Sequence, residues 1–132
     1  MANCKQVFTP MILGLKLVKD DGAPKADWKV YRSLIGSLLY LTISRPDILF
    51  AVNYLSRFMQ EPSQTHFMAA KRILRYLQGT KNLGMHFAKN RENKLVGFTD
   101  SDWAGSDECM MSTSGYCFAL GVNVFSWISK KQ

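Results

Sequence analysis

Two aspartates one residue apart, Asp100 and Asp102, are the residues of this sequence best suited to metal chemistry. They follow the alternating run Leu95-Val-Gly-Phe-Thr99, so a strand here would place both carboxylates on the face of Val96 and Phe98. Carboxylates this close repel each other unless a cation or hydrogen-bond donors lie between them, and Mg²⁺ suits such oxygen ligands. The alternative is a solvated acidic turn after the strand, which spacing alone favours.

Cations gather on one side of a helix predicted at about 64–78. At 100° per residue, Lys71, Arg72 and Arg75 lie opposite an apolar side. Such a ridge suits a phosphate backbone, although an ordinary solvated helix face has the same composition. His66 and His86 lie twenty residues apart with no partner at metal-ligand spacing, so we expect surface or capping roles for them.

Composition limits the classes of protein to which the chain can belong. Its 132 residues, 47% hydrophobic and 20% charged, allow one domain or one small domain plus part of another. The net charge of +7 lies in residues 1–92, with 14 Lys/Arg against 6 Asp/Glu; the remaining 40 residues hold 3 against 4. Three cysteines without a C-x-x-C pair argue against a disulfide framework or a cysteine-rich zinc site, and they suit a reducing compartment. We expect no transmembrane segment and read no signal peptide.

Helical spacing of apolar residues covers the first part of the chain after an extended lead-in at 1–26. A first helix is predicted at about 28–43, with Asp27 as its N-cap. A capping box at Ser44-Arg-Pro-Asp47 predicts a second helix that runs to about Gln60. The third helix is expected to stop at Gly79 as its C-cap.

The period then changes from 3.6 to 2, which predicts strands. A short strand is expected at Leu83–Phe87 within a connector at 81–93. Three further runs, 95–99, 115–120 and 122–127, predict an antiparallel meander at 94–132. The fold class is therefore α+β, with a helical segment at 27–80 before the sheet. We expect one apolar sheet face that presents Val96, Phe98, Tyr116, Phe118 and Trp127.

A set of motifs in this order resembles the polymerase polyprotein of copia-type retrotransposons. The resemblance rests on Tyr31–Leu41, Arg45–Ile48, His66–Gly79, Phe98–Gly105, Ser112–Tyr116 and Ser126–Gln132. It implies that residues 1 to about 80 follow a reverse-transcriptase palm and include thumb-like helices. It also implies that residues from about 94 form the first three strands of an RNase H domain.

Within that resemblance, Asp100 matches the first catalytic carboxylate of the RNase H fold, and Asp102 is a neighbour. In the family this carboxylate helps to hold two Mg²⁺ ions, which activate water as the RNA of a hybrid is cut. Family members supply a catalytic Glu and another Asp after the Lys-Lys-Gln of residues 130–132, and their palm carboxylates lie upstream of Met1. We therefore expect no catalysis and no cofactor in isolation; RNase H activity would need the missing part in trans.

A second resemblance rests on four residues. Arg72-Ile73-Leu74-Arg75 fits the R-x-L-R string of secreted oomycete effectors, which enter host cells and suppress cell death. Three hypotheses follow: a non-catalytic retroelement segment that binds an RNA–DNA hybrid, an effector that binds host proteins, and an RNase H completed in trans. The site of action is intracellular under the first and inside host cells after secretion under the second. We also expect self-association through the sheet.

Overall fold

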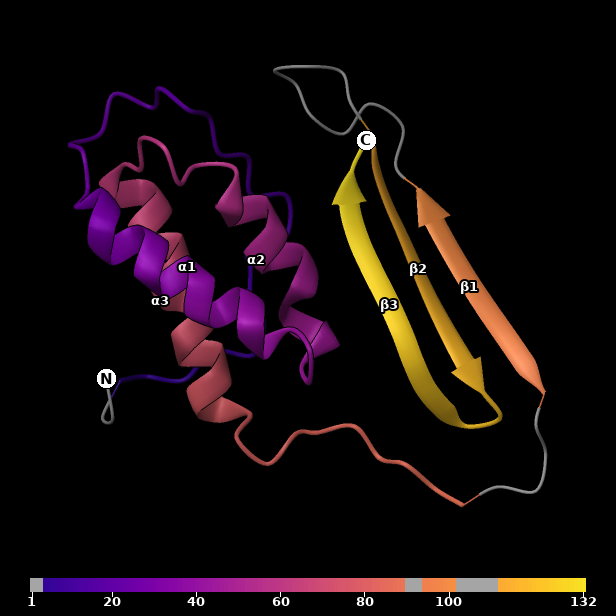
Figure 1. Cartoon of the computed structure of the whole chain (residues 1–132). Helices are drawn as coiled ribbons and strands as arrows, with labels where there is room; N and C mark the ends of the chain where they lie inside the picture. Colours follow the sequence, from indigo (N-terminus) through magenta and orange to yellow (C-terminus); the bar gives the residue numbers. More distant parts are fainter. Residues whose placement is uncertain (1–3, 90–93, 102–111) are drawn as a thin grey trace. The chain divides into compact units, whose positions relative to one another are not determined.

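The computed structural model of the chain describes residues 4–89, 94–101 and 112–132. Three α-helices precede a three-stranded antiparallel sheet (Figure 1), which confirms the predicted α+β class. The chain divides into two compact units, Met1–Leu83 with the helices and Gly84–Gln132 with the sheet. No helix among the described residues is long and apolar enough to cross a membrane.

Helix α1 spans Trp28–Leu41 and begins at the predicted N-cap. A carboxylate oxygen of Asp27 accepts hydrogen bonds from the backbone N–H groups of Lys29 at 2.8 Å and Val30 at 3.2 Å. This side chain therefore satisfies two of the N–H groups that every helix start leaves without an intrahelical partner. The helix ends two residues before the predicted position.

The second helix differs from its prediction at both ends. A 3₁₀ turn, η1 (Pro46–Ile48), leads into α2, which spans Leu49–Ser56 and stops short of Gln60. The predicted capping box is wrong: the hydroxyl of Ser44 donates to the carbonyl of Leu41 at 3.3 Å. The Asp47 carboxylate is bound by the Arg45 guanidinium, and this charged pairing is stronger than a bond to a neutral backbone donor.

Helix α3 spans Gln64–Gly79 and starts with a capping box that sequence analysis did not foresee. The Ser63 hydroxyl accepts from the N–H of His66 at 3.4 Å, and the N–H of Ser63 donates to His66 Nδ1 at 2.9 Å. The C-cap is Thr80, so the assignment of Gly79 to that place was off by one residue.

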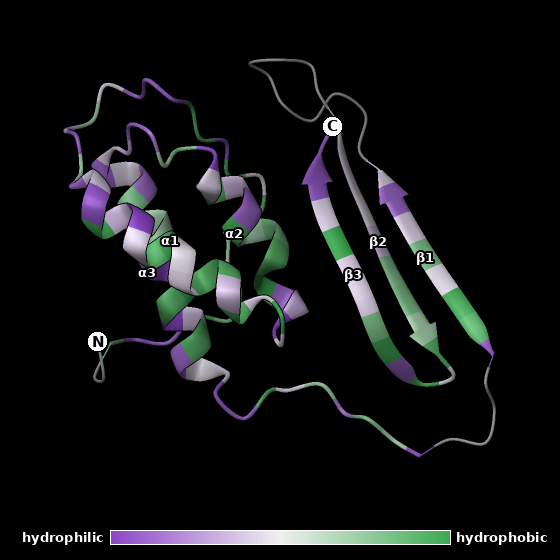
Figure 2. Cartoon of the chain, viewed as in Figure 1, coloured by the Kyte–Doolittle hydropathy of each residue, from purple (hydrophilic) through white to green (hydrophobic). Residues whose placement is uncertain are grey.

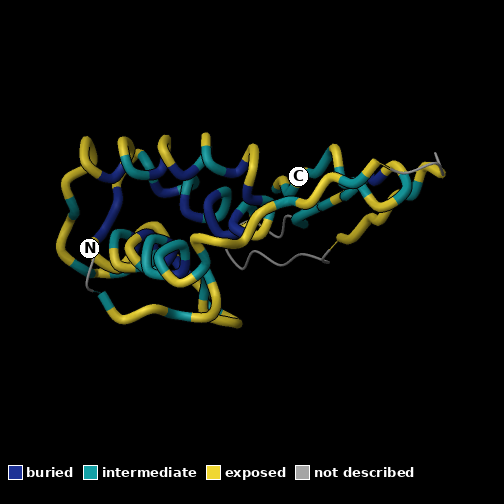
Figure 3. The backbone as a smooth tube through the Cα atoms, turned by 90° about the horizontal axis from the view of Figure 1, so that it is seen from below, coloured by how far each residue is buried: buried dark blue, intermediate teal, exposed yellow. Residues whose placement is uncertain are grey.

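The three helices enclose one hydrophobic core, and the described part of the sheet unit has little. Buried positions gather along α1, η1, α2 and α3, whereas the strands are mostly half-buried or exposed (Figure 3). Much of α2 is hydrophobic (Figure 2), which fits its burial between neighbours. The fully buried large apolar side chains are Tyr31, Ile35, Ile48, Val52, Leu55 and Ile73.

The lead-in carries no helix or strand from residue 4 to 27 apart from a bridge between Lys25 and Ser63, yet it packs on the helices. The hydroxyl of Tyr54 accepts from the N–H of Leu17 at 2.9 Å. The carbonyl of Val18 lies 3.0 Å from Nε2 of His66. We call residues 4–18 the strap (the indigo segment of Figure 1).

The sheet consists of β1 (Leu95–Ser101), β2 (Thr113–Leu120) and β3 (Asn123–Lys131) in the order β1-β2-β3. Gly121 makes the β2–β3 turn with φ +60°, a conformation that favours glycine. The short strand expected at residues 83–87 is not formed. The connector is held by a side chain, because the amide of Asn123 bonds both the N–H and the carbonyl of Ala88, at 2.7 and 2.8 Å.

The strand register corrects the predicted apolar face. Phe98 pairs with Cys117, and Cys117 pairs with Trp127, so these residues share a face. Tyr116 and Phe118 are the neighbours of Cys117 along β2 and therefore belong to the opposite face. Apolar side chains are thus divided between both faces of the sheet, and Ala119 is the one buried hydrophobic residue among the described strands.

Candidate functional site

Asp100 lies on β1 opposite Gly115 and is exposed. Alternation along the strand places it on the face of Val96 and Phe98, as the spacing predicted. Asp102 lies outside the described residues. Within the described part of the chain, no group of three or more His, Cys, Asp or Glu side chains is arranged to hold a metal ion. Asp100 therefore stands there as a single candidate carboxylate ligand.

An open pocket of about 860 Å³ extends over the same end of the sheet. Asp100 and Gly115 border the pocket from one face of the sheet. Side chains of the opposite face form most of its lining, and Thr99, Tyr116 and Ile128 form one cross-strand row there. Ser101, Ser114 and Lys130 form the next row. The pocket is therefore polar and cationic at one edge, and its described lining holds no acidic side chain besides Asp100.

The three cations predicted as a ridge on α3 have different surroundings. Lys71 is exposed, and its Nζ lies 4.5 Å from the ring centroid of Phe67. Arg72 donates from Nη2 to the hydroxyl of Thr9 at 2.9 Å, and Arg75 donates from Nε to the carbonyl of Lys5 at 2.7 Å. Two of the three predicted cations therefore bind the strap.

The R-x-L-R string is part of a packed helix. Ile73 is fully buried, and Leu74 is half-buried against the core. Nε of Arg72 is buried and has no hydrogen-bond partner. The string thus presents its arginines from the helix surface while its apolar residues hold α3 in place.

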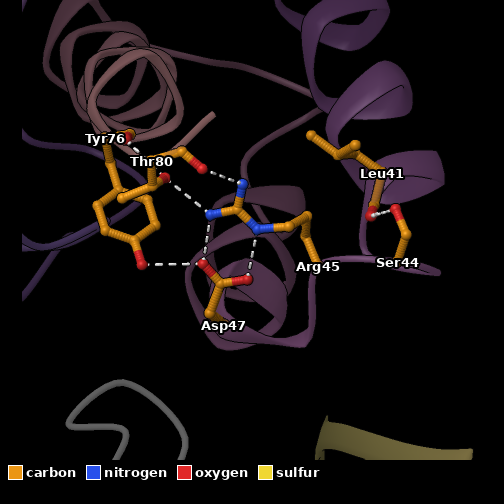
Figure 4. Close-up of polar contacts among 6 residues, drawn as sticks. All are labelled: Leu41, Ser44, Arg45, Asp47, Tyr76 and Thr80. Atoms are coloured by element: carbon orange, nitrogen blue, oxygen red, sulfur yellow. Dashed lines mark hydrogen bonds and ion pairs between the residues drawn. The ribbon is translucent and has the colours of Figure 1, made fainter. Parts of the chain in front are cut away.

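A partly buried ionic network, which sequence reasoning missed, joins η1 to the end of α3 (Figure 4). Arg45 binds both carboxylate oxygens of Asp47, at 2.8 Å from Nε and 2.6 Å from Nη2. The same guanidinium donates to the carbonyl and hydroxyl of Thr80 at 3.1 and 2.8 Å. The hydroxyl of Tyr76 donates to Asp47 at 2.8 Å. Arg45 thereby caps the C-terminus of α3, where carbonyls lack helical partners.

This network changes the acidity of its members. Burial by itself would raise the pKa of Asp47, but hydrogen bonds from Arg45 and Tyr76 and the Arg45 charge together lower that pKa below its ordinary value. Burial, together with the bond to Asp47, raises the pKa of Tyr76. The Arg45-x-Asp47 spacing was the available signal, because an arginine two residues before an aspartate in a tight turn can bind it with both nitrogens.

His66 is a structural residue, and the predicted capping role is confirmed. It is fully buried, stacks on Phe58 with ring centroids 3.9 Å apart, and accepts from the N–H of Ser63 through Nδ1. Its Nε2 faces the carbonyl of Val18, which can only accept, so the neutral Nε2–H tautomer satisfies both bonds. The hydroxyl of Ser63 donates to Asp21 at 2.7 Å, and this bond lowers the pKa of Asp21. His86, in contrast, is exposed.

Similar proteins come mainly from transposable elements. Over 132 residues the chain is 46% identical to the retrovirus-related Pol polyprotein from transposon RE1 of Arabidopsis thaliana. The aligned region is 100% of this chain and 9% of that protein. The chain is 39% identical over 139 residues to the retrovirus-related Pol polyprotein from transposon TNT 1-94 of Nicotiana tabacum, covering 10% of that protein. The chain therefore spans about a tenth of the length of these polyproteins.

One relative that is not named as a transposon protein is aligned over most of its own length. The secreted RxLR effector protein 161 of Plasmopara viticola is 48% identical over 103 residues, which make up 77% of this chain and 72% of that protein. No family model matches the chain, and no solved structure matches it. Identity of 39–46% along the whole chain shows that it is homologous to a segment of the retrovirus-related Pol polyproteins of copia-type transposons.

Proposed function

We propose that this chain is the part of a retroelement Pol polyprotein that links thumb-like helices of the reverse transcriptase to the first strands of an RNase H domain. By itself it binds an RNA–DNA hybrid and does not cut it. The observation that carries the proposal is Asp100 on β1 of an antiparallel β1-β2-β3 sheet, in a chain 46% identical to a Pol polyprotein along its whole length.

Catalytic silence follows from the number of ligands. Two-metal hydrolysis needs several carboxylates, which clamp the attacking and the leaving oxygen between two ions. In the intact parent domain, Asp100 would be one ligand of Mg²⁺, and the ions would supply the activated water. In the described part of this chain it has no companion group of metal ligands. One exposed carboxylate binds a divalent ion too weakly to fix a pair of them.

Binding is the activity that the charge supports. The helical half carries the net positive charge, and α3 presents Lys71, Arg72 and Arg75 on its surface side. Phosphate contacts of this kind release counterions, so affinity must fall as salt rises.

Hydrolysis of a labelled RNA–DNA hybrid in Mg²⁺ tests the catalytic part of the proposal. We expect no cleavage by the purified chain, and none by an Asp100→Asn variant. Cleavage by the natural chain that disappears in Asp100→Asn would contradict the proposal. If cleavage is absent from the chain alone but arises when the following part of the parent domain is supplied, then Asp100 is a functional ligand in the complete site.

Fluorescence anisotropy with the same hybrid tests the binding part. Affinity should decrease with salt, and the triple variant Lys71→Gln, Arg72→Gln, Arg75→Gln should lose most of that dependence. A matched variant with Lys94, Lys130 and Lys131 changed to Gln removes the same charge from the sheet unit. Equal losses in both variants would mean that net charge, and not the α3 surface, determines binding.

A second candidate function rests on the similarity to the secreted RxLR effector protein 161. Under that hypothesis the chain acts in a host cell on host proteins. Expression in host cells, with and without a secretion signal, should then suppress induced cell death. The variant Arg72→Ala, Arg75→Ala should lose this suppression only when the chain is secreted and must enter the cell. The buried Ile73 and half-buried Leu74 favour the retroelement proposal, because they make the string part of a helix and not a linear signal.

A further inference from the structure

We propose that the strap, residues 4–18, is a built-in competitor for the phosphate-binding surface of α3, so that hybrid binding and strap docking exclude each other at Arg72 and Arg75. The inference rests on the proposed hybrid binding and adds its regulation. In the docked state the strap occupies two arginines and leaves Lys71 exposed.

The strap presents oxygen acceptors to the two arginines of α3, as a phosphate would. Arg72 binds the hydroxyl oxygen of Thr9, and Arg75 binds the carbonyl oxygen of Lys5, at 2.9 and 2.7 Å. Both partners are neutral acceptors, and a phosphate oxygen is a charged one that forms stronger bonds with a guanidinium. The buried Nε of Arg72 has no partner, so the docked strap leaves this guanidinium incompletely satisfied.

The two ends of the strap are held differently, which lets one end leave while the other stays. At its C-terminal end, Leu17 is buried and its backbone bonds the hydroxyl of Tyr54. At its N-terminal end the backbone carries no helix or strand, and Phe8 is 99% exposed. Gly14, with φ +71°, lies between the two parts and provides a conformation for a bend that other residues rarely adopt.

Docking of the strap nevertheless has a favourable term that makes it the resting state. Val7 and Met11 are partly buried against the helical core, and release would expose them to water. A ligand must therefore offer more to Arg72 and Arg75 than two neutral oxygens do. A polyanion meets that condition, because several phosphates bind at once and counterions are released.

The test compares hybrid binding by the full chain, by Thr9→Ala and by a deletion of residues 1–10. The deletion removes Lys5 and no acidic residue, so net charge falls from +7 to +6 and simple electrostatics predicts weaker binding. Strap competition predicts the opposite: about tenfold tighter binding, with an unchanged slope of log K against log salt, because Arg72 and Arg75 contact phosphate in both complexes once the strap has left. Thr9→Ala should tighten binding by a smaller factor, because it removes one of the two hydrogen bonds that hold the strap on α3.

Two variants serve as matched controls. Thr9→Ser keeps the hydroxyl and should behave as the natural chain, and Phe8→Ala changes an exposed neighbour and should have no effect. Circular dichroism checks that the deletion keeps its helices; Thr9→Ala carries the test if it does not. Backbone amides of residues 5–11 should exchange faster with solvent when hybrid is bound.

The outcomes separate the two proposals. Unchanged or weaker affinity in both the deletion and Thr9→Ala, with salt-dependent binding by the full chain, would overturn strap competition and leave hybrid binding intact. Absence of binding by every form, the deletion included, would overturn both. Tighter binding by the deletion that persists after Arg72→Gln and Arg75→Gln would also overturn the competition, because the gain would then come from elsewhere.

Discussion

The helical unit and the sheet unit of this chain differ in how they bury their apolar side chains. Three helices and a strap enclose twelve buried core residues in the first unit. The second, as far as the structure describes it, is a single layer whose apolar residues are divided between two faces. A sheet of this kind becomes stable when another layer covers at least one face. The comparison teaches that the first unit has its own core, and that the second depends on added surface.

A pair of truncations should show the largest difference between the units. Ile73→Ala removes a fully buried side chain of α3 and should lower the free energy of unfolding of the helical unit by about 3 kcal/mol, from lost transfer energy and the cavity left behind. Phe98→Ala on β1, at a side chain 65% exposed, should cost less than about 1 kcal/mol. Urea denaturation measures both. Similar costs would mean that the sheet has a core equivalent to that of the helices.

Substitution of Arg45 should have the next largest effect, because its guanidinium is buried in the helical unit and binds both Asp47 and Thr80. Arg45→Ala leaves Asp47 without its charged partner and removes two bonds to Thr80, which should cost about 1–2 kcal/mol because water can solvate the Asp47 carboxylate. Arg45→Lys should recover only part of this, since an ammonium cannot bind both carboxylate oxygens in parallel. The exposed Lys81→Ala is the control, with no expected effect. A neutral Arg45→Ala variant would show the network to be dispensable.

The same network predicts how the helical unit responds to acid. The folded pKa of Asp47 lies below its unfolded value, so its ionised form stabilises the fold at pH values above about 4. That stabilisation is lost as pH falls below about 4 and through the folded pKa. Asp47→Asn should therefore be destabilised at pH 7 and should lose less further stability on acidification than the natural chain. Thermal unfolding from pH 7 to pH 2 measures this difference, and parallel pH profiles would contradict the assignment.

The smallest expected effect concerns self-association, which the exposed strands favour. Sedimentation should show a weight-average mass that rises with concentration, and Phe98→Lys should reduce that rise. Phe8→Lys changes an equally apolar, fully exposed residue of the helical unit and should have little effect. If the strap substitution abolishes association and the strand substitution does not, then the helical unit and not the sheet carries the contact surface.

Local patterns predicted the elements, and tertiary contacts explain where those predictions were wrong. Asp27 was identified as an N-cap because its hydrogen bonds are to residues two and three positions away. The Ser44 box was predicted in the same way and was wrong, since Asp47 had a stronger partner in Arg45. Periodicity predicted each strand, but the relation between strands depends on register, which moved Tyr116 and Phe118 to the opposite face.

The candidate site was predictable to a similar extent. Alternation placed Asp100 on the face of Val96 and Phe98 without any knowledge of the partner strands. Helical geometry put Lys71, Arg72 and Arg75 on one side of α3. The partners of Arg72 and Arg75 could not be predicted, because Thr9 and Lys5 lie more than sixty residues away in a segment without periodicity. A long-range hydrogen bond to an irregular segment has no signature in local spacing.

Hydrogen exchange of the whole chain, followed amide by amide, tests the difference between the units most directly. Amides at buried positions of α1, α2 and α3 should exchange only through global opening of the helical unit. Amides of β1, β2 and β3 should exchange much faster, through local opening of a sheet without a core of its own, at concentrations where the chain is monomeric. Strand amides protected as strongly as those of α3 in the monomer would contradict the conclusion that the sheet depends on added surface.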